Sequence, residues 1–205
     1  MLQSLFDHFS SSLYPYFWKY RHLWSKGWPE SYLSDESVNQ IHRRLLCEAI
    51  EKLEPFWNIH EYGCGPGANL LWFTRQFPHA KIFGYDVSGA AIFEAAKTFY
   101  FSEKVHLVRT SKLEPKGEID VLVTDACLIY DKNPSEMFSI AMQFMNNGYV
   151  GCEWHADCDK SFTYGRHWVH NFKKLLPGCE LRKLTWNDWP DDGWSTYGHI
   201  ITWRK

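Results

Sequence analysis

The residues best suited to chemistry form a short glycine-rich segment, Glu61-Tyr62-Gly63-Cys64-Gly65-Pro66-Gly67. Glycine allows a tight turn and lets a ligand approach the main chain closely. A helix that begins directly after such a turn offers free N–H donors and the positive end of its dipole, which suit an anionic group. Further along the chain, Asp86 can accept hydrogen bonds from both hydroxyls of a ribose. The segment and Asp86 therefore predict a site for a ligand that carries these groups.

Two further residues are candidates for proton transfer. Asp125 and His155 each follow an apolar run that is expected to be a strand, and open α/β sheets bind ligands at the carboxyl ends of their strands. Asp125 can also contact a bound ligand without moving a proton. His155 can equally be a strand-end histidine that is hydrogen-bonded to neighbouring main chain.

Charge and cysteine usage argue against several kinds of partner and site. The formal net charge of −2 gives no broad attraction for nucleic acid or for an anionic membrane. We find no signal peptide or membrane span, so we expect a cytoplasmic protein with six reduced cysteines. Cys152, His155 and Cys158 lack the spacing of a paired Cys-x-x-Cys site, and the first two project from opposite sides of one strand. We expect no metal site.

The elements that must position these residues follow from hydrophobic periodicity and from cap and turn residues. Apolar residues at helical spacing predict a helix from Ser34 that stops before Pro55. Strands are expected at 56–62, 80–86, 104–109, 119–125, 149–155, 179–186 and 197–203. Further helices are expected at 68–77, at 90–99 with Ser88 as N-cap, from Asn133 to Asn147-Gly148, and at 162–176. Glu136 is expected to complete a capping box with Asn133.

The order of these elements predicts an α/β fold. Strands that alternate with helices favour a parallel sheet with helices on both faces. The last two strands are separated only by the turn-rich residues 187–195, so they pair most simply as an antiparallel hairpin.

Two motifs carry a resemblance to a known family. The segment Glu61–Gly67 resembles the first motif of class I S-adenosylmethionine-dependent methyltransferases, and Gly84-Tyr85-Asp86-Val87-Ser88 resembles their second. The resemblance covers roughly residues 56–205. It implies a Rossmann-like three-layer sandwich with a mostly parallel seven-stranded sheet and an antiparallel C-terminal hairpin strand. It also implies S-adenosylmethionine as cofactor and S-adenosylhomocysteine as product.

The resemblance assigns roles to individual residues. Glu61 would organise the turn, the glycines would pass under the methionine part of the cofactor, and Asp86 would hold its ribose. The fourth strand would end with Asp125-Ala126-Cys127 facing the sulfonium. Thr110 and Ser111 stand where many members have an acidic residue near the adenine, so the adenine contacts are less clearly assigned. The cofactor-binding residues expected in this way are Glu61, Gly63, Cys64, Gly65, Gly67, Asp86, Val87, Thr110, Ser111, Asp125 and Ala126.

The glycines also fit two alternative interpretations. Gly63-x-Gly65-x-x-Ala68 satisfies the dinucleotide-binding fingerprint, and a glycine turn can be purely structural. The Gly65-Pro66-Gly67 run, the terminal hairpin and the little room for a separate substrate domain favour the methyltransferase. No Asn/Asp-Pro-Pro-Tyr motif is present, which argues against methylation of adenine in DNA.

Residues 1–33 are crowded with aromatic side chains and lie outside the strand–helix pattern of residues 34–205. They could form a lid over the acceptor site, or they could be ordinary packing. The expected activity is transfer of a methyl group from S-adenosylmethionine to a small-molecule acceptor. An RNA or protein acceptor, or a non-catalytic partner protein that binds the cofactor, are the alternatives. The sequence does not fix the oligomeric state.

Overall fold

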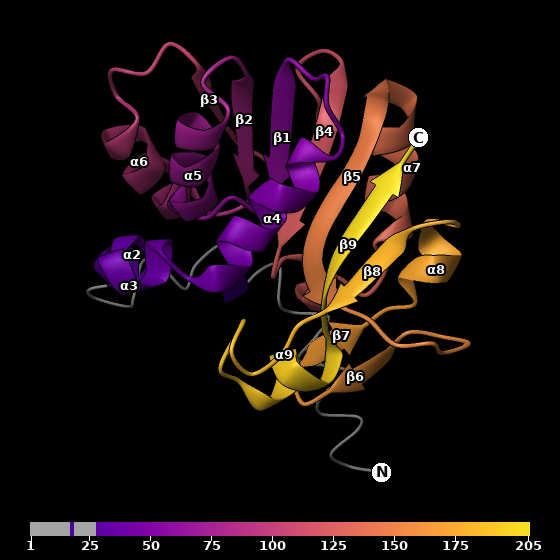
Figure 1. Ribbon diagram of the computed structural model, residues 1–205. Coiled ribbons are helices and arrows are strands. Elements are labelled where there is room, and N and C mark those ends of the chain that lie inside the picture. Colours follow the sequence, from indigo (N-terminus) through magenta and orange to yellow (C-terminus); the bar gives the residue numbers. More distant parts are fainter. Residues whose placement is uncertain (1–16, 19–27) are drawn as a thin grey trace.

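The computed structural model describes residues 17–18 and 28–205 of the chain. Most of the expected lid segment, residues 1–33, lies outside the described residues. The main sheet has seven strands in the order β3-β2-β1-β4-β5-β9-β8 (Figure 1). Its strands are β1 (Asn58–Tyr62), β2 (Lys81–Asp86), β3 (Val105–Arg109), β4 (Ile119–Asp125), β5 (Met145–Trp154), β8 (Glu180–Lys183) and β9 (Gly198–Arg204).

The sheet is parallel except at one strand. The first five strands pair in parallel, whereas β9 pairs antiparallel with both β5 and β8. The predicted antiparallel hairpin is therefore confirmed, and β9 is inserted between β8 and the parallel strands. Strand β4, Ile-Asp-Val-Leu-Val-Thr-Asp, is buried along almost its whole length. That burial agrees with the apolar residues Ile119, Val121, Leu122 and Val123 in this strand, since parallel strands are covered on both faces.

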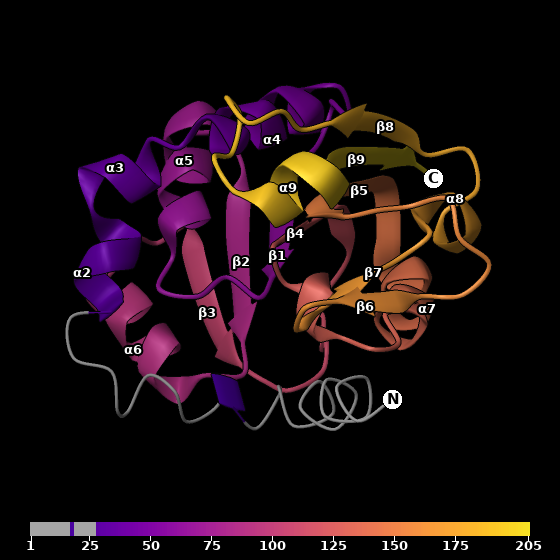
Figure 2. The same cartoon turned by 90° about the horizontal axis from the view of Figure 1, so that it is seen from below.

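Helices cover both faces, as the resemblance implies. One core cluster contains residues of α4 (Ile41–Glu51), α5 (Ala68–Gln76) and α6 (Gly89–Thr98). The other contains residues of α7 (Ser135–Phe144) and α8 (Phe172–Leu175). Further short elements are α2 (Trp28–Leu33), α3 (Asp35–Val38), η1 (Leu128–Tyr130), β6 (Phe162–Tyr164), β7 (His167–Val169) and α9 (Asp192–Tyr197). Figure 2 looks onto the ends of the strands on the side where β6, β7 and α9 lie.

The helix predicted from Ser34 is in fact two helices. Ser34 is the N-cap of α3, as expected, and its side chain accepts a hydrogen bond from Ser37 N. The chain then leaves the helical conformation at Asn39 and Gln40, before α4 begins. This break turns Ile41 outward, where it is 41% exposed.

The helix predicted at 162–176 is wrong over most of its length. The chain instead forms the antiparallel hairpin β6–β7, followed by the single turn of α8. Gly165 makes the hairpin possible because its φ of +58° lies in the left-handed region that favours glycine. Aromatic and β-branched residues on both sides of Gly165 suit strands better than a helix.

Both predicted ends of the helix before β5 are corrected. Pro134, not Asn133, is the N-cap of α7, and the Glu136 carboxylate pairs with Lys112 instead of completing a capping box. The helix ends at Phe144 and β5 begins at once, so Asn147-Gly148 lies inside the strand. The expected loop 187–195 also contains the start of α9. Within the described residues, no helix is long and apolar enough to cross a bilayer.

Candidate functional site

The glycine turn follows β1 and is fixed to the neighbouring strand. Gly63 N and Cys64 N both donate to Tyr85 O, at 2.7 and 3.0 Å. Gly63 has a φ of +83°, and a Cβ at this position would lie 2.4 Å from Cys127 Sγ. Gly65 has a φ of +54° and no described atom within 4 Å of the corresponding point. The turn is therefore packed against Cys127 on one side and open at Gly65.

Asp86 closes the turn from the end of β2. Its Oδ2 accepts a hydrogen bond from Gly65 N at 2.8 Å, and its Oδ1 accepts one from Ser88 N at 2.7 Å. Burial raises the pKa of Asp86, and these N–H donors oppose the rise. Each carboxylate oxygen can accept a second hydrogen bond. Asp86 can therefore hold the turn and still bind ligand hydroxyls.

A buried polar network lies beside the turn and joins four elements. Asp125 Oδ2, at the end of β4, accepts hydrogen bonds from Arg43 Nη1 at 3.1 Å and from Asn69 Nδ2 at 2.9 Å. His42 Nε2 lies 3.2 Å from the same oxygen. Asn69 Nδ2 also donates to Glu61 Oε1 at 2.6 Å, and Arg43 Nη1 donates to Asn69 Oδ1.

Each carboxylate of this network keeps one buried oxygen without a hydrogen bond to any described residue: Asp125 Oδ1 and Glu61 Oε2. Buried polar atoms are rarely left in this state, because the loss of water costs about 1–3 kcal/mol per group. Both residues line cavities, so a ligand can supply the missing donors.

The two carboxyl groups differ in charge. Burial raises the pKa of Glu61 to about 8, against the opposing hydrogen bond from Asn69. Burial acts in the same direction on Asp125, but His42, Arg43 and the Asn69 hydrogen bond together lower its pKa to about 2. At neutral pH, Glu61 is therefore mostly protonated and Asp125 is ionised. A carboxylate with so low a pKa is a weak base and a good partner for a cation.

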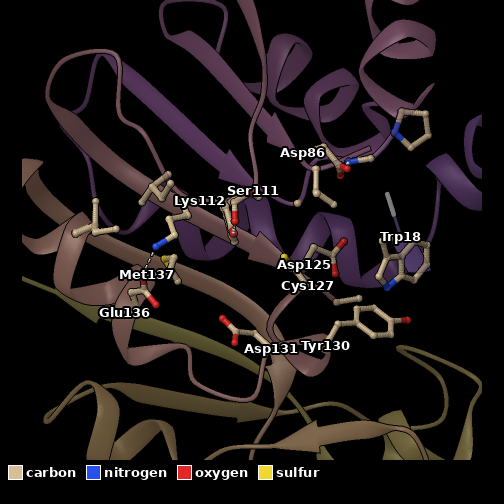
Figure 3. A pocket seen from close by; sticks show the side chains of 18 of the residues that line it. Trp18, Asp86, Ser111, Lys112, Asp125, Cys127, Tyr130, Asp131, Glu136 and Met137 are labelled. Atoms are coloured by element: carbon tan, nitrogen blue, oxygen red, sulfur yellow. Dashed lines mark hydrogen bonds and ion pairs between the residues drawn. The ribbon is translucent and has the colours of Figure 1, made fainter. Parts of the chain in front are cut away.

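Two adjoining cavities open where the parallel strands end, which we call the carboxyl edge of the sheet. The first, of about 380 Å³, extends from Asp86 to Glu136 and is lined by Trp18 and Tyr130 at one end (Figure 3). The second, of about 350 Å³, is lined by α3, α4, α5 and the loop that contains Trp189. Residues common to both linings are Tyr32, Gly63, Gly65, Pro66, Asp125, Ala126 and Tyr130. The cavities therefore meet beside the glycine turn and the end of β4.

Most of the residues predicted from sequence lie together in these linings. The first cavity includes Gly63, Gly65, Asp86, Val87, Ser111, Asp125 and Ala126. The second adds Glu61 and Cys64. Gly67 lines neither of these two cavities; it is the left-handed N-cap of α5. Thr110 also lies outside both linings, and its hydroxyl donates to Lys112 O at 2.7 Å.

His155 directly follows β5, and its role in proton transfer stays a prediction. Its Nδ1 accepts a hydrogen bond from Phe172 N at 3.1 Å, and it lines neither of the two cavities formed by the described residues. Its place is that of the structural strand-end histidine. His167, on β7, is the histidine that lines the second cavity. Burial lowers the pKa of His167, so its ring is neutral near pH 7.

The partners of Asp125 were not predicted from the sequence. His42 falls on the apolar stripe of α4, where Leu45, Leu46 and Ala49 are also buried. A polar residue at such a position was the available signal. Arg43 and Asn69 gave no comparable signal, because their burial depends on how α3, α4 and α5 pack together.

Comparisons with known proteins agree with this arrangement. Residues 35–197 match the sequence profile of a family described as methyltransferase domain. A comparison with curated proteins gives no match. The fold is similar to that of magnesium protoporphyrin IX methyltransferase from Synechocystis PCC 6803 with bound S-adenosylmethionine, at TM-score 0.62 and 16% identity over 96% of this chain and 97% of that one.

Two other solved structures have the same fold. The plantazolicin methyltransferase in complex with S-adenosylhomocysteine gives TM-score 0.62 and 14% identity, over 98% of this chain and 99% of that one. An O-methyltransferase family protein from Burkholderia thailandensis gives TM-score 0.66 and 13% identity, over 92% of this chain and 64% of that one. At these identities the likeness concerns the fold alone.

Proposed function

The chain belongs to the methyltransferase domain family and uses S-adenosylmethionine, and from this premise we propose that it transfers the methyl group to a small-molecule acceptor. The observation that carries the proposal is the position of Asp125. Its ionised carboxylate has one buried oxygen without a hydrogen bond in the described chain, at the place where two cavities meet. A cationic cofactor on one side and an acceptor on the other would both reach this point.

The nucleoside end of the cofactor fits the first cavity. Asp86 has free acceptor capacity there, and Val87 and Ser111 line the same wall. Gly65 leaves the main chain accessible, because no described atom occupies the space beside it. We assign ribose binding to Asp86 and adenine binding to the Ser111 side of this cavity.

The amino-acid end of the cofactor fits the polar network. Asp125 Oδ1 would face positive charge, while the protonated Glu61 can donate a hydrogen bond instead of adding a second negative charge. Bound S-adenosylmethionine supplies a methyl group on a positively charged sulfur, already activated toward a nucleophile. The chain then contributes alignment of the acceptor, which can supply about 7–11 kcal/mol of the barrier reduction.

Proton transfer is assigned to neither residue suggested by the sequence. Asp125 is too weak a base, and His155 lies outside both cavities. If the acceptor arrives protonated, the neutral His167 ring is the group in the second cavity that can accept the proton. Catalysis of this kind contributes about 10²–10⁴-fold.

We also propose that residues 1–33 cover the acceptor. Trp18 and Tyr32 line the first cavity, and the Trp18 ring packs edge-on against Tyr130 at 4.9 Å between centroids. Aromatic side chains at this position exclude water from the transfer. The surface of this first cavity is mostly apolar, which supports a small acceptor that can enter it.

The test is calorimetry of the full chain with S-adenosylmethionine and S-adenosylhomocysteine, followed by turnover with a panel of small phenols, amines, thiols and carboxylic acids. We expect both cofactors to bind and at least one small acceptor to be methylated. No binding of either cofactor would overturn the cofactor site. Binding with turnover only on RNA or protein, or with no turnover at all, would overturn the small-molecule assignment.

A further inference from the structure

The segment that joins β4 to η1, residues 126–129, has an unusual conformation. Ala126 has a φ of +52° and is the only non-glycine residue with a positive φ in the described part of the chain. This left-handed conformation is unfavourable for a residue with a Cβ, and it persists only where the surroundings impose it. Ala126 and Cys127 both line the first cavity. The strain therefore lies in the wall of the site.

One buried carboxylate holds this segment from the next strand. Glu153, near the end of β5, is fully buried. Its Oε1 accepts hydrogen bonds from Cys127 N at 3.0 Å and Leu128 N at 3.1 Å. Its Oε2 accepts from Leu128 N at 3.1 Å and Ile129 N at 3.2 Å. Three successive main-chain N–H groups are thus satisfied by one side chain.

Two further hydrogen bonds fix the same segment. Ala126 N donates to Cys152 O at 2.9 Å, which continues the pairing of β4 with β5. His170 Nε2 lies 3.0 Å from Leu128 O, so the buried imidazole donates to that carbonyl. Cys127, held between these contacts, packs its sulfur against Gly63. The position of the glycine turn therefore depends on the position of this segment.

We infer that Glu153 is a positioning residue for methyl transfer: its carboxylate holds residues 126–129 in the strained conformation that shapes the cofactor side of the site. Glu153 does not line either described cavity and acts through Ala126 and Cys127. The inference rests on the proposed cofactor site. It predicts that loss of the Glu153 carboxylate lowers the affinity for the cofactor more than it lowers the stability of the fold.

The chain offers a matched control for this effect. Asp120, at the opposite end of β4, is also a buried carboxylate that accepts main-chain N–H groups, from Trp57 at 2.7 Å and Asn58 at 3.0 Å. Glu153→Gln and Asp120→Asn both replace a carboxylate by an amide, and in both an NH₂ group then faces N–H donors. Only the first change affects the wall of the cavity.

The experiment is calorimetric titration of S-adenosylhomocysteine into the full-length wild type, Glu153→Gln and Asp120→Asn, with thermal unfolding of each. We expect both variants to lose several degrees in Tm. The dissociation constant should rise about tenfold or more in Glu153→Gln and stay within about twofold in Asp120→Asn. Equal affinity in Glu153→Gln and wild type would overturn the inference, whereas failure of the wild type to bind would overturn the proposed function.

A second variant tests the role of strain. In the Glu153→Gln background, Ala126→Gly should recover most of the lost affinity, because glycine adopts a positive φ without the Cβ penalty. A purely structural role for Glu153 predicts no such recovery. If Glu153→Gln does not fold, Glu153→Asp keeps the carboxyl group but draws it back from the segment, and the same loss and recovery are expected. Absence of any recovery in either background would overturn the inference.

Discussion

Strand β4 carries an aspartate with a buried side chain near each end, and the two ends differ in how their polar atoms are satisfied. At the amino end, both oxygens of Asp120 accept hydrogen bonds, from Trp57 N, Asn58 and Asn146 Nδ2. At the carboxyl end, Asp125 concentrates three contacts on Oδ2 and leaves Oδ1 without any in the described structure. Asp120 therefore contributes to stability, whereas Asp125 Oδ1 can still accept a hydrogen bond from a ligand.

Backbone conformation also differs between the amino edge of the sheet, where the parallel strands begin, and the carboxyl edge, where they end. Both have glycines with positive φ: Gly117 precedes β4 at the amino edge, and Gly65 follows β1 at the carboxyl edge. Only the carboxyl edge also holds a non-glycine residue, Ala126, in this region of φ among the residues that the structure describes. Strain and unsatisfied polar atoms occur together where function is proposed, as is usual for ligand sites.

The largest effect is expected for Gly65→Arg. The new side chain would enter the space where both cavities meet, so we expect binding of S-adenosylhomocysteine to fall below detection by calorimetry. Gly117→Arg is the matched change at the amino edge, since Gly117 also has a positive φ and open space beside it. Both variants should lose stability through the strained φ. Equal binding by the two variants would remove the functional contrast between the edges.

The next effect is expected for Asp125→Asn. An amide NH₂ that faces a cationic cofactor replaces a carboxylate, and loss of a charged hydrogen bond costs about 1.5–3 kcal/mol. The affinity for S-adenosylmethionine should fall about tenfold to a hundredfold. S-adenosylhomocysteine lacks the sulfonium charge, so a smaller loss for it would place Oδ1 at the sulfur. An equal loss would place Oδ1 at the ammonium group, and no loss for either would contradict the assigned contact.

Glu61→Gln tests the charge difference at the carboxyl edge. The pKa of Glu61 is raised from an ordinary value of 4.5 to about 8 in the folded chain, so the unfolded chain releases this proton first as pH rises. Its contribution to stability is complete below pH 4.5 and is lost progressively as pH rises through 8. The slope is about 1.4 kcal/mol per pH unit.

Urea unfolding between pH 5 and 9 measures this slope. We expect the free energy of unfolding to fall less steeply with pH in Glu61→Gln than in the wild type. Glu118→Gln, an exposed carboxylate at the amino edge, is the control and should keep the wild-type slope. Parallel curves for all three proteins would show that Glu61 titrates normally.

Sequence patterns predicted the two edges unequally well. The bounds of β4 were predicted correctly, because a short segment rich in Ile, Val and Leu with an aspartate near each end has few alternatives. The glycine turn and Asp86 could be predicted together from local spacing, and the structure joins them by the hydrogen bond from Gly65 N to Asp86 Oδ2. The partners of Asp125 were missed, since Arg43 and Asn69 reach it only through packing of α4 and α5. The hairpin β6–β7 was missed because its aromatic residues also match a helical period.

The smallest effect on the site is expected for His155→Ala. His155 follows β5 at the carboxyl edge, but its Nδ1 accepts a hydrogen bond from Phe172 N. In this it resembles Asp120 at the amino edge, which also accepts main-chain N–H groups. Its removal should cost about 1–3 kcal/mol of stability through the unsatisfied N–H. The affinity for S-adenosylhomocysteine should stay within about twofold. His167→Ala, which changes the wall of the second cavity, should instead alter turnover with little loss of stability, because β7 is a short edge strand. A loss of cofactor affinity in His155→Ala would mean that position on the edge, and not the set of hydrogen bonds, determines which residues serve the site.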